Sequence, residues 1–401
     1  PCPCPYCQDM PHVMTIADIE EMVKSYAEAA RRAKEAGFDA VEIHGAHGYL
    51  IAQFMSAYSN RRTDRYGGDL RSRMRFAVEI LEASRSKVGP DFPIIFRFSA
   101  DERVPGGRNL DESATIAPML VAAGADCLSI STGVYANLET YCIAPMAVPK
   151  GLNIHLAEEI KKVVDVPIIV VGKLNDPLMA EQVIAQGKAD LVAIGRGLYA
   201  DPELPNKVAA GQFEDIRWCT ACLQECIHTL ATAFTTRCQV NPEIGRERQM
   251  AITPAAKSRR VLVVGGGPAG MEAARVAALR GHDVTLYEKE VELGGQFRIA
   301  SIPPTKQEIL PFVKYQARQL EKSGVKVVLG EEATASTVDG LKPEVVVVAT
   351  GSRPLIPDIP GAGGENVVTA HDVLTFKVRT GQRVVIAGGG FVGCETADLL
   401  A

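Results

Sequence analysis

One unit recurs along the first half of the chain: a helical segment, a glycine, an aspartate and then a short apolar run. Its three copies have Gly37 and Asp39 before residues 41–44, Gly124 and Asp126 before residues 127–131, and Gly187 and Asp190 before residues 191–195. Glycine after a helix adopts the left-handed backbone of the position that ends it. An apolar run too short for a helix fits a strand buried in a parallel sheet. The unit therefore predicts helices that alternate with parallel strands.

Two further apolar runs, residues 94–98 and 167–171, bring the expected strands to five. Strands that alternate with helices are typical of a βα-barrel and not of a β-sandwich. The first helix is expected between Thr15, which can cap it together with Asp18, and Gly37. The aspartates of the recurring unit precede their strands, at the end of a barrel that serves stability, so we interpret them as turn-forming. The predicted fold class is α/β.

The composition is that of an ordinary globular protein of two or three domains. The 401 residues are 47% hydrophobic and 23% charged, with a formal net charge of −5. No Lys/Arg run is dense enough for a nucleic-acid surface, and no apolar stretch is long enough to span a membrane. Ten cysteines without a signal peptide predict a reducing, cytoplasmic location. Because the chain begins at Pro1 and ends at Ala401 within an expected helix, we expect a fragment.

Two glycine-rich turns in the second half have the pattern of dinucleotide-binding loops. The first, Gly265, Gly267 and Gly270, follows an expected strand at residues 261–264, opens a helix at 271–280 and precedes an acid, Glu288, at the end of a strand at 283–287. Such glycines let the backbone approach a pyrophosphate, and the acid can accept hydrogen bonds from a ribose. A further strand is expected at 345–349. The second turn follows an expected strand at 384–387 and comprises Gly388, Gly390 and Gly393. Two such turns suggest two nucleotides, one flavin and one nicotinamide.

Four cysteines lie between the two halves with the spacing C-x2-C-x3-C-x11-C: Cys219, Cys222, Cys226 and Cys238. A cubane iron–sulfur cluster needs four thiolates, three of which usually come from one tight loop. A zinc site also takes four thiolates but usually as two separated C-x2-C pairs, and a disulfide framework suits short secreted chains. We therefore favour an iron–sulfur cluster, with zinc as the alternative. Cys2, Cys4 and Cys7 form a second group to which we assign no role.

Polar residues follow several strands of the expected barrel, at the end where barrels build active sites. His44 and His47 can donate hydrogen bonds to one substrate oxygen, and Tyr49 can supply a proton; the alternative is a satisfied polar rim. Arg97, after residues 94–96, can stabilise negative charge on a flavin ring. Barrels commonly bind phosphate after their last two strands. The residues placed there are Gly172, Gly195 and Arg196.

The segment from His44 to Ser56, followed by residues 60–68 (NRRTDRYGG), resembles the Old Yellow Enzyme superfamily of FMN-containing barrels. With the cysteines and both fingerprints, the chain is similar to the multidomain branch, which includes 2,4-dienoyl-CoA reductase, 2-enoate reductase, steroid enone reductases and trimethylamine dehydrogenase. The resemblance implies FMN in the barrel, a [4Fe-4S] cluster on the four cysteines, FAD on the first fingerprint and NAD(P)H near the second. It adds four FAD-domain residues: Gly295, Gln296, Thr350 and Gly351.

The resemblance also implies an organisation. Residues 1–205 would be the last five strands of a (β/α)8 TIM barrel that binds FMN, and residues 206–258 the cluster module and linker. Residues 259–380 would be a Rossmann-like FAD domain, and residues 381–401 the start of an NAD(P) domain.

The function expected from this resemblance is NAD(P)H-dependent reduction of an activated C=C bond in a small unsaturated carbonyl or enoate. Amine dehydrogenases of the branch carry Tyr where His44 stands, and dienoyl-CoA reductases lack both histidines. The alternatives are amine oxidation, 2,4-dienoyl-CoA reduction and a non-catalytic electron-transfer subunit. A homo-oligomer is possible.

Overall fold

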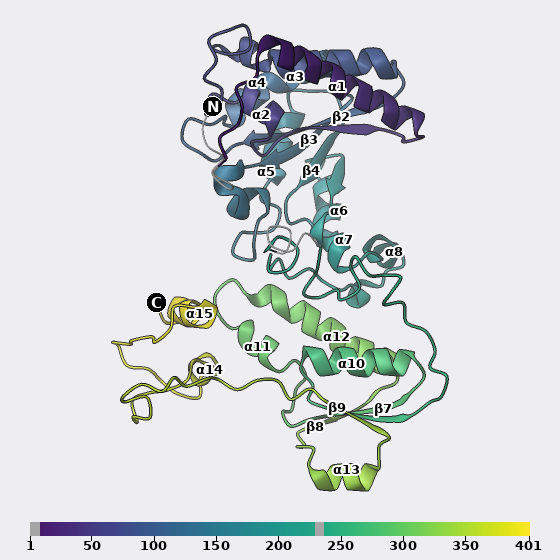
Figure 1. Ribbon diagram of the computed structural model, residues 1–401, viewed down its shortest axis with the longest axis vertical. Coiled ribbons are helices and arrows are strands. Elements are labelled where there is room, and N and C mark those ends of the chain that lie inside the picture. The colour runs from purple at the N-terminus through teal and green to yellow at the C-terminus, as the bar shows by residue number, and fades with distance from the viewer. Residues whose placement is uncertain (1–8, 229–235) are drawn as a thin grey trace. The chain divides into compact units, whose positions relative to one another are not determined.

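Five parallel strands follow one another in chain order, β1-β2-β3-β4-β5, in the sheet of the first half of the chain (Figure 1). The computed structural model describes residues 9–228 and 236–401, so Cys2, Cys4 and Cys7 lie outside the described residues. The chain divides into two units, one up to Gly195 and one from Arg196. Each neighbouring pair of strands is joined through a helix, as the recurring unit predicts.

The elements of the first unit agree with the expected ones to within a few residues at each end. The strands are β1 (Val41–Gly45), β2 (Ile94–Asp101), β3 (Cys127–Thr132), β4 (Ile168–Val171) and β5 (Leu191–Ala193). The helices are α1 (Ile16–Glu35), α2 (Leu50–Met55), α3 (Leu70–Val88), α4 (Leu110–Ala122), α5 (Ile154–Lys161) and α6 (Pro177–Ala185). Thr15 and Asp18 form the expected capping box at the start of α1.

The two faces of the first sheet differ in kind. Side chains such as Phe96, Phe98 and Ile130 are fully buried in the apolar core that the sheet shares with its helices. Because side chains alternate along a strand, the residues between them point to the opposite face. There, His44, Arg97 and Ser129 lie in one row across β1, β2 and β3. This second face carries the polar residues near the carboxyl ends of the strands.

The aspartates of the recurring unit close the other end of the sheet. Asp126 accepts a hydrogen bond from the backbone N–H of Ile94 (2.7 Å) and is paired with Arg85. Asp190 accepts from the N–H of Ile168 (2.8 Å) and is paired with Lys161. The glycines in the three copies of the recurring sequence unit, Gly37, Gly124 and Gly187, have positive φ. Asp126 and Asp190 therefore have the structural role expected of them.

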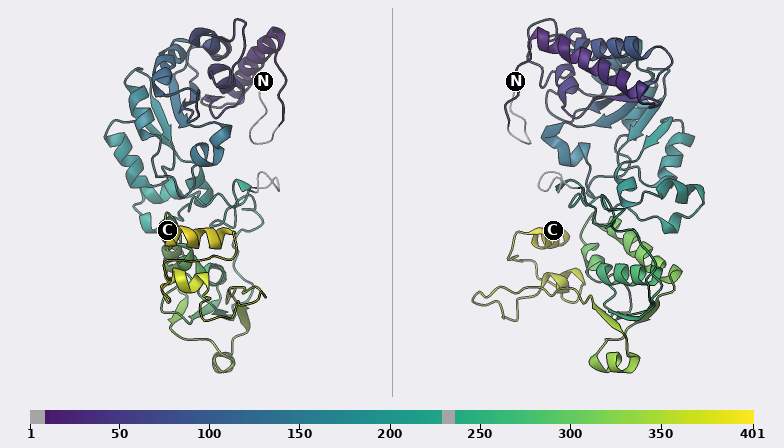
Figure 2. Two further views of the ribbon diagram at one scale, coloured as in Figure 1. Left: turned by 90° about the vertical axis from the view of Figure 1, so that its left-hand side faces the viewer. Right: turned by 45° about the vertical axis from the view of Figure 1, so that its right-hand side comes forward.

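The second unit contains a four-stranded parallel sheet in the order β8-β7-β6-β9, on which α10 and α12 lie side by side (Figures 1 and 2). Its strands are β6 (Arg260–Val264), β7 (Asp283–Glu288), β8 (Lys326–Leu329) and β9 (Val345–Val348). Its helices are α7 (Arg196–Ala200), α8 (Leu204–Ala209), α10 (Pro268–Leu279), α11 (Gln296–Ala300), α12 (Leu310–Lys322), α13 (Ala335–Leu341), α14 (Ala370–Leu374) and α15 (Phe391–Leu400).

Two expectations about strands need correction. Residues 384–387 do not form a strand: Val385 is 96% exposed and Val384 is about half exposed, so this apolar run has no neighbouring strand to pair with in the part of the chain described. Conversely, a strand at β8 (Lys326–Leu329) was not expected from the sequence. No helix within the described residues is long and apolar enough to cross a membrane.

Candidate functional site

His44, His47 and Tyr49 lie together at the carboxyl end of β1. The rings of the two histidines have centroids 5.2 Å apart in an edge-to-face arrangement, and the ring of Tyr49 lies 5.0 Å from that of His44. His44 is within β1, whereas Tyr49 occupies the N-cap position of α2 and is 44% exposed. The structure therefore brings the three expected catalytic side chains into one group.

His47 is fixed by the neighbouring strands. It has a φ of 60°, a left-handed conformation that is unusual for a residue with a side chain. Its backbone N–H donates to Ser99 Oγ (3.1 Å), and its ring Nε2 is 2.6 Å from Ser131 Oγ. One ring nitrogen of His47 is therefore engaged with β3.

Both histidines are held neutral by their surroundings. Burial, the guanidinium of Arg97 and the neighbouring His44 together lower the pKa of His47 to about 3. Burial and Arg97 also lower the pKa of His44. A neutral imidazole still donates one N–H, so the pair can polarise a carbonyl oxygen without carrying a charge.

Arg97 lies on the polar face between His44 and Ser129, and its strand continues past it to Asp101 instead of ending before it. Its Nη1 is 3.8 Å from the carboxylate of Glu42. Three buried polar atoms in this row have no hydrogen-bond partner among the described residues: His44 Nδ1, Arg97 Nε and Ser129 Oγ. Unpaired buried polar groups are costly, so this row is chemically suited to bind a further polar group.

A second tyrosine contacts Tyr49. The hydroxyl of Tyr135 donates to the hydroxyl of Tyr49 (2.8 Å), and the two rings lie edge to face with centroids 5.1 Å apart. Both residues line a cavity of about 760 Å³ together with apolar side chains such as Leu50 and Val134. A volume of this order accommodates a drug-sized molecule. Tyr49 therefore faces a space in which a substrate fits.

A buried ion pair supports this end of the sheet. Arg108 Nη1 lies 3.5 Å from Glu102 Oε1, and the two side chains are 0% and 1% exposed. Glu102 accepts a hydrogen bond from Ser56 Oγ (2.5 Å), at the end of α2, while Arg108 donates to the carbonyl of Ser99 (2.8 Å). The pair thus joins the segment that carries Tyr49 to the strand that holds His47.

The residues expected to bind phosphate fall in both units. Gly172 follows β4 with a φ of 144°, and its carbonyl accepts from the N–H of Gly151 (3.0 Å). Gly195 has open space where a side chain would be. Arg196 begins the second unit and lines the cavity that contains the cysteines, with its Nη1 buried and unpaired among the described residues. Binding of phosphate by these three residues stays a prediction.

The first glycine fingerprint has the close backbone packing expected of a dinucleotide loop. A Cβ on Gly270 would lie 1.9 Å from the carbonyl oxygen of Gly265, so α10 packs directly on the turn. At Gly267, by contrast, nothing lies within 4 Å of such a Cβ. Glu288 is buried and accepts from the backbone N–H of Gly266 (2.6 Å) and of Glu290 (2.9 Å). The loop is thus shaped to leave Gly267 accessible to a ligand.

The other expected FAD-domain residues lie against the same loop. A Cβ on Gly295 would be 3.2 Å from Gly267 Cα, and one on Gly265 would be 3.3 Å from Thr350 Cα. Gln296 donates to the carbonyl of Ser352 (2.7 Å), and its Nε2 would lie 3.7 Å from a Cβ on Gly351. Residues far apart in sequence therefore converge on the first fingerprint.

The second fingerprint has the same local geometry although its preceding strand is not formed. Gly388 has a φ of 113°, and a Cβ on Gly393 would lie 1.9 Å from the carbonyl oxygen of Gly388. Gly390 is the N-cap residue of α15 and has open space around it. The turn is therefore a second copy of the first, as expected from the sequence.

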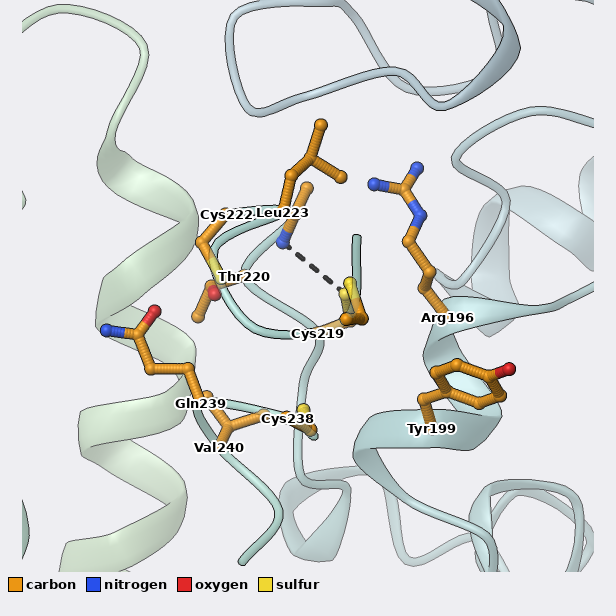
Figure 3. Close-up of a pocket in the computed structure, with 11 residues that line it drawn as sticks. Arg196, Tyr199, Cys219, Thr220, Cys222, Leu223, Cys238, Gln239 and Val240 are labelled. Carbon is orange, nitrogen blue, oxygen red and sulfur yellow. Dashed lines mark hydrogen bonds between the residues drawn. The ribbon is translucent and has the colours of Figure 1, made fainter. Parts of the chain in front are cut away.

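The four cysteines of the spaced motif line one small cavity (Figure 3). The backbone N–H of Ala221 donates to Cys219 Sγ (3.4 Å), and burial raises the pKa of the Cys219 thiol to about 11. Burial also raises the pKa values of Cys226 and Cys238. Within the described residues, no three His, Cys, Asp or Glu side chains are close enough together to hold a single metal ion.

Several functional contacts were not expected from the sequence. Ser99, Ser131 and Tyr135 contact the predicted catalytic residues, and none of them was assigned a role. The two serines lie on the same face as Arg97, so the alternation of side chains along β2 and β3 was the available signal. Tyr135 begins a short 3-10 helix (Tyr135–Asn137) after β3 and has no such signal.

Both halves of the chain match known protein families. The sequence profile described as "NADH:flavin oxidoreductase / NADH oxidase family" matches residues 5–215, and that described as "Pyridine nucleotide-disulphide oxidoreductase" matches residues 259–401. The chain belongs to the NADH:flavin oxidoreductase / NADH oxidase family. As expected from the sequence, this is an Old Yellow Enzyme-like multidomain flavoprotein family of oxidoreductases.

Three relatives illustrate the similarity. An NADH oxidase of Thermoanaerobacter brockii is 49% identical over all of this chain and 62% of its own length. A cinnamate reductase of Clostridium sporogenes is 41% identical over 96% of this chain and 60% of its own. A solved structure of a 2-naphthoyl-CoA reductase complex is 39% identical, with a TM-score of 0.93 over 97% of this chain and 59% of its own. The chain thus spans about three fifths of the length of these relatives.

Proposed function

We propose that this chain takes part in NAD(P)H-dependent reduction of a C=C bond activated by a carbonyl or carboxylate group. The observation that carries the proposal is the group formed by His44, His47 and Tyr49, with two neutral hydrogen-bond donors beside one phenol at the edge of a large cavity. Relatives named cinnamate reductase and 2-naphthoyl-CoA reductase support the same class of reaction.

In this proposal the two histidines bind the oxygen of the activating group. His44 offers a buried Nδ1 that has no partner among the described residues, and Ser131 holds the ring of His47 in place. Withdrawal of electron density toward that oxygen makes the β-carbon electrophilic. Tyr49 then donates its phenolic proton to the α-carbon, and the exposed position of its ring permits contact with a substrate in the cavity.

The unpaired Arg97 Nε and Ser129 Oγ of the barrel face fit an FMN ring system. We assign the ring to the row that contains Arg97, whose positive charge would stabilise negative charge on the flavin, and the phosphate to Gly172, Gly195 and Arg196. When bound, FMN supplies the hydride acceptor and donor that the amino-acid side chains lack. Without FMN, the site would have no group that delivers hydride to the substrate.

We assign FAD to the first fingerprint and NAD(P)H to the second. The open position at Gly267 fits a pyrophosphate, and the buried carboxylate of Glu288 retains lone pairs for a ribose hydroxyl. These assignments use the domain boundaries after residues 205, 258 and 380 that the resemblance implies. In this arrangement the nicotinamide would lie beside the FAD and the substrate beside the FMN, so that each fingerprint binds one nucleotide.

We assign a [4Fe-4S] cluster to Cys219, Cys222, Cys226 and Cys238. All four thiols line one cavity, yet no three of them are placed to hold a single ion. Three of the four cysteines come from one short segment, as is usual for an iron–sulfur cluster, whereas zinc usually takes two separated C-x2-C pairs. The donor set thus favours a cluster over zinc, and one-electron transfer between the two flavins is the chemistry that it would supply.

The experiment is substitution of Tyr49 by Phe in the purified holoenzyme, with Tyr58→Phe, on the same cavity, as a matched control. Tyr49→Phe should leave NAD(P)H-driven flavin reduction unchanged and slow enone turnover by at least about 100-fold. Unchanged turnover of 2-cyclohexenone and cinnamate would refute the assignment of Tyr49. Oxidation of trimethylamine with an electron acceptor, without enone reduction, would instead support amine oxidation.

A further inference from the structure

The contact between Tyr135 and Tyr49 has a direction that matters chemically. Tyr135 donates its hydroxyl proton to the oxygen of Tyr49 (2.8 Å), so the proton of Tyr49 is not used in this bond. A phenol that gives up its proton becomes a phenolate, and a hydrogen bond to a charged acceptor is roughly twice as strong as one to a neutral acceptor. The contact is therefore worth more after proton donation than before it.

The segment that carries Tyr135 is held against the catalytic group from two sides. Val134 forms a parallel bridge with His47 and accepts a hydrogen bond from the thiol of Cys142 (3.6 Å). Asn137 accepts from the N–H of Val134 (2.8 Å) and donates to the carbonyls of Glu102 and Arg103 (3.0 Å each). A side chain on such a pinned segment keeps its position relative to Tyr49.

Both glycines of this contact have a left-handed backbone, and space is limited at Gly133. A Cβ on Gly133, which has a φ of 82°, would lie 2.8 Å from Asn137 Oδ1 and from Cys142 Sγ. A Cβ on Gly48, with a φ of 76°, would lie 3.4 Å from the backbone N of Tyr135. The two loops thus approach each other through glycines, which is the arrangement needed to bring the two hydroxyls together.

We propose that Tyr135 is a positioning residue that stabilises deprotonated Tyr49 and returns a proton to it from water in the cavity. This inference rests on the proposed function, because it assumes that Tyr49 is the proton donor. It adds a residue that follows β3, whereas His44, His47 and Tyr49 lie at the end of β1. The hydroxyl of Tyr135 would then have a role in every turnover.

The O–H bond of Tyr49 breaks and a C–H bond forms at the α-carbon with the electron pair of the C=C bond. The β-carbon would gain a hydride equivalent whose two electrons NAD(P)H supplies. The phenolate of Tyr49 then takes the proton of Tyr135, and Tyr135 takes one from water. Both residues line the cavity of about 760 Å³, which gives solvent access to them. One hydride and one solvent proton are consumed per bond reduced.

The test is Tyr135→Phe in the holoenzyme, with 2-cyclohexenone as substrate and Tyr141→Phe as the matched control. Tyr141 lies in the same loop, where its ring is 5.7 Å from the guanidinium of Arg103. Tyr135→Phe should lower kcat for the enone by about 10- to 100-fold, with KM changed by less than about threefold, because one donor to a developing anion is lost. The solvent deuterium isotope effect on enone-driven flavin oxidation should rise, and NAD(P)H-driven flavin reduction should stay unchanged.

A double-mutant cycle separates this role from a structural one. In a Tyr49→Phe background, Tyr135→Phe should cause no further loss, since its partner hydroxyl is already absent. Tyr135→His, which retains a donor, should recover part of the activity. Wild-type kcat in Tyr135→Phe, an equal loss in Tyr141→Phe, or additive losses in the double variant would each overturn the inference. A Tyr49→Phe variant with full activity would instead overturn the proposed function.

Discussion

The buried Glu102–Arg108 pair permits a quantitative prediction about stability. Substitution of Glu102 by Gln keeps the shape of the side chain but leaves the fully buried guanidinium of Arg108 without its ion-pair partner. Loss of one partner from a buried ion pair costs about 3–5 kcal/mol. The first unit extends to Gly195, and a domain of this size shifts its melting temperature by about 2–4 °C per kcal/mol. We therefore expect Tm to fall by roughly 6–20 °C.

The assay is thermal unfolding of the holoenzyme at one fixed scan rate and pH, with Glu20→Gln as the control. Glu20 pairs with Arg65 on the surface, where the two side chains are 53% and 51% exposed, so its loss should cost less than about 1 kcal/mol. A Glu102→Gln/Arg108→Met double variant should recover part of the loss, because it no longer buries an unpaired charge. If Glu102→Gln shifts Tm no more than Glu20→Gln does, the buried pair does not have the role inferred here.

Three further predictions concern the other parts of the site. The folded-state pKa of His47, about 3, lies below the unfolded value of about 6.5, so the unfolded chain binds the extra proton first as pH falls. The stability that neutral His47 contributes is complete above pH 6.5 and decreases by about 2 kcal/mol by pH 5. The variant His47→Asn should flatten this dependence on pH in urea unfolding measured at several pH values. Gly270→Ala should destabilise the second unit by about 1–3 kcal/mol or more, because its Cβ would strike the carbonyl of Gly265. Gly267→Ala should instead keep Tm and lose FAD, as measured by absorbance after desalting. The reverse pattern would contradict the assignment. Cys238→Ser should lower bound iron and labile sulfide in anaerobically purified protein, whereas Cys394→Ser, at an exposed thiol, should not; equal iron in both would count against the cluster.

The parts of the fold that local rules determine could be predicted from the sequence. Gly37, Gly124 and Gly187 end their helices with positive φ because glycine has no Cβ to oppose it, and the following apolar runs form strands of one parallel sheet. The same holds for the fingerprint at Gly265–Gly270, where the spacing of the glycines reflects direct backbone contact.

Contacts that depend on tertiary structure could not be predicted in this way. Tyr135 meets Tyr49 across 86 positions of sequence, and no periodic pattern relates two loops that far apart. The apolar run at 384–387 shows the opposite failure. Its residues are suited to a strand, but a strand forms only where a neighbour supplies hydrogen bonds, and sequence pattern alone does not show whether that neighbour is present.

The carboxylates of Asp126 and Asp190 hold one rim of the first sheet, while His44, Tyr49 and Tyr135 occupy the opposite rim. The aspartate contacts that hold the strands in register therefore lie at the rim opposite the candidate catalytic side chains. Exchange of the 133–152 segment with that of a related reductase should therefore alter substrate preference while the aspartate rim keeps the strands in register. This separation makes the segment a practical starting point for redesign of specificity.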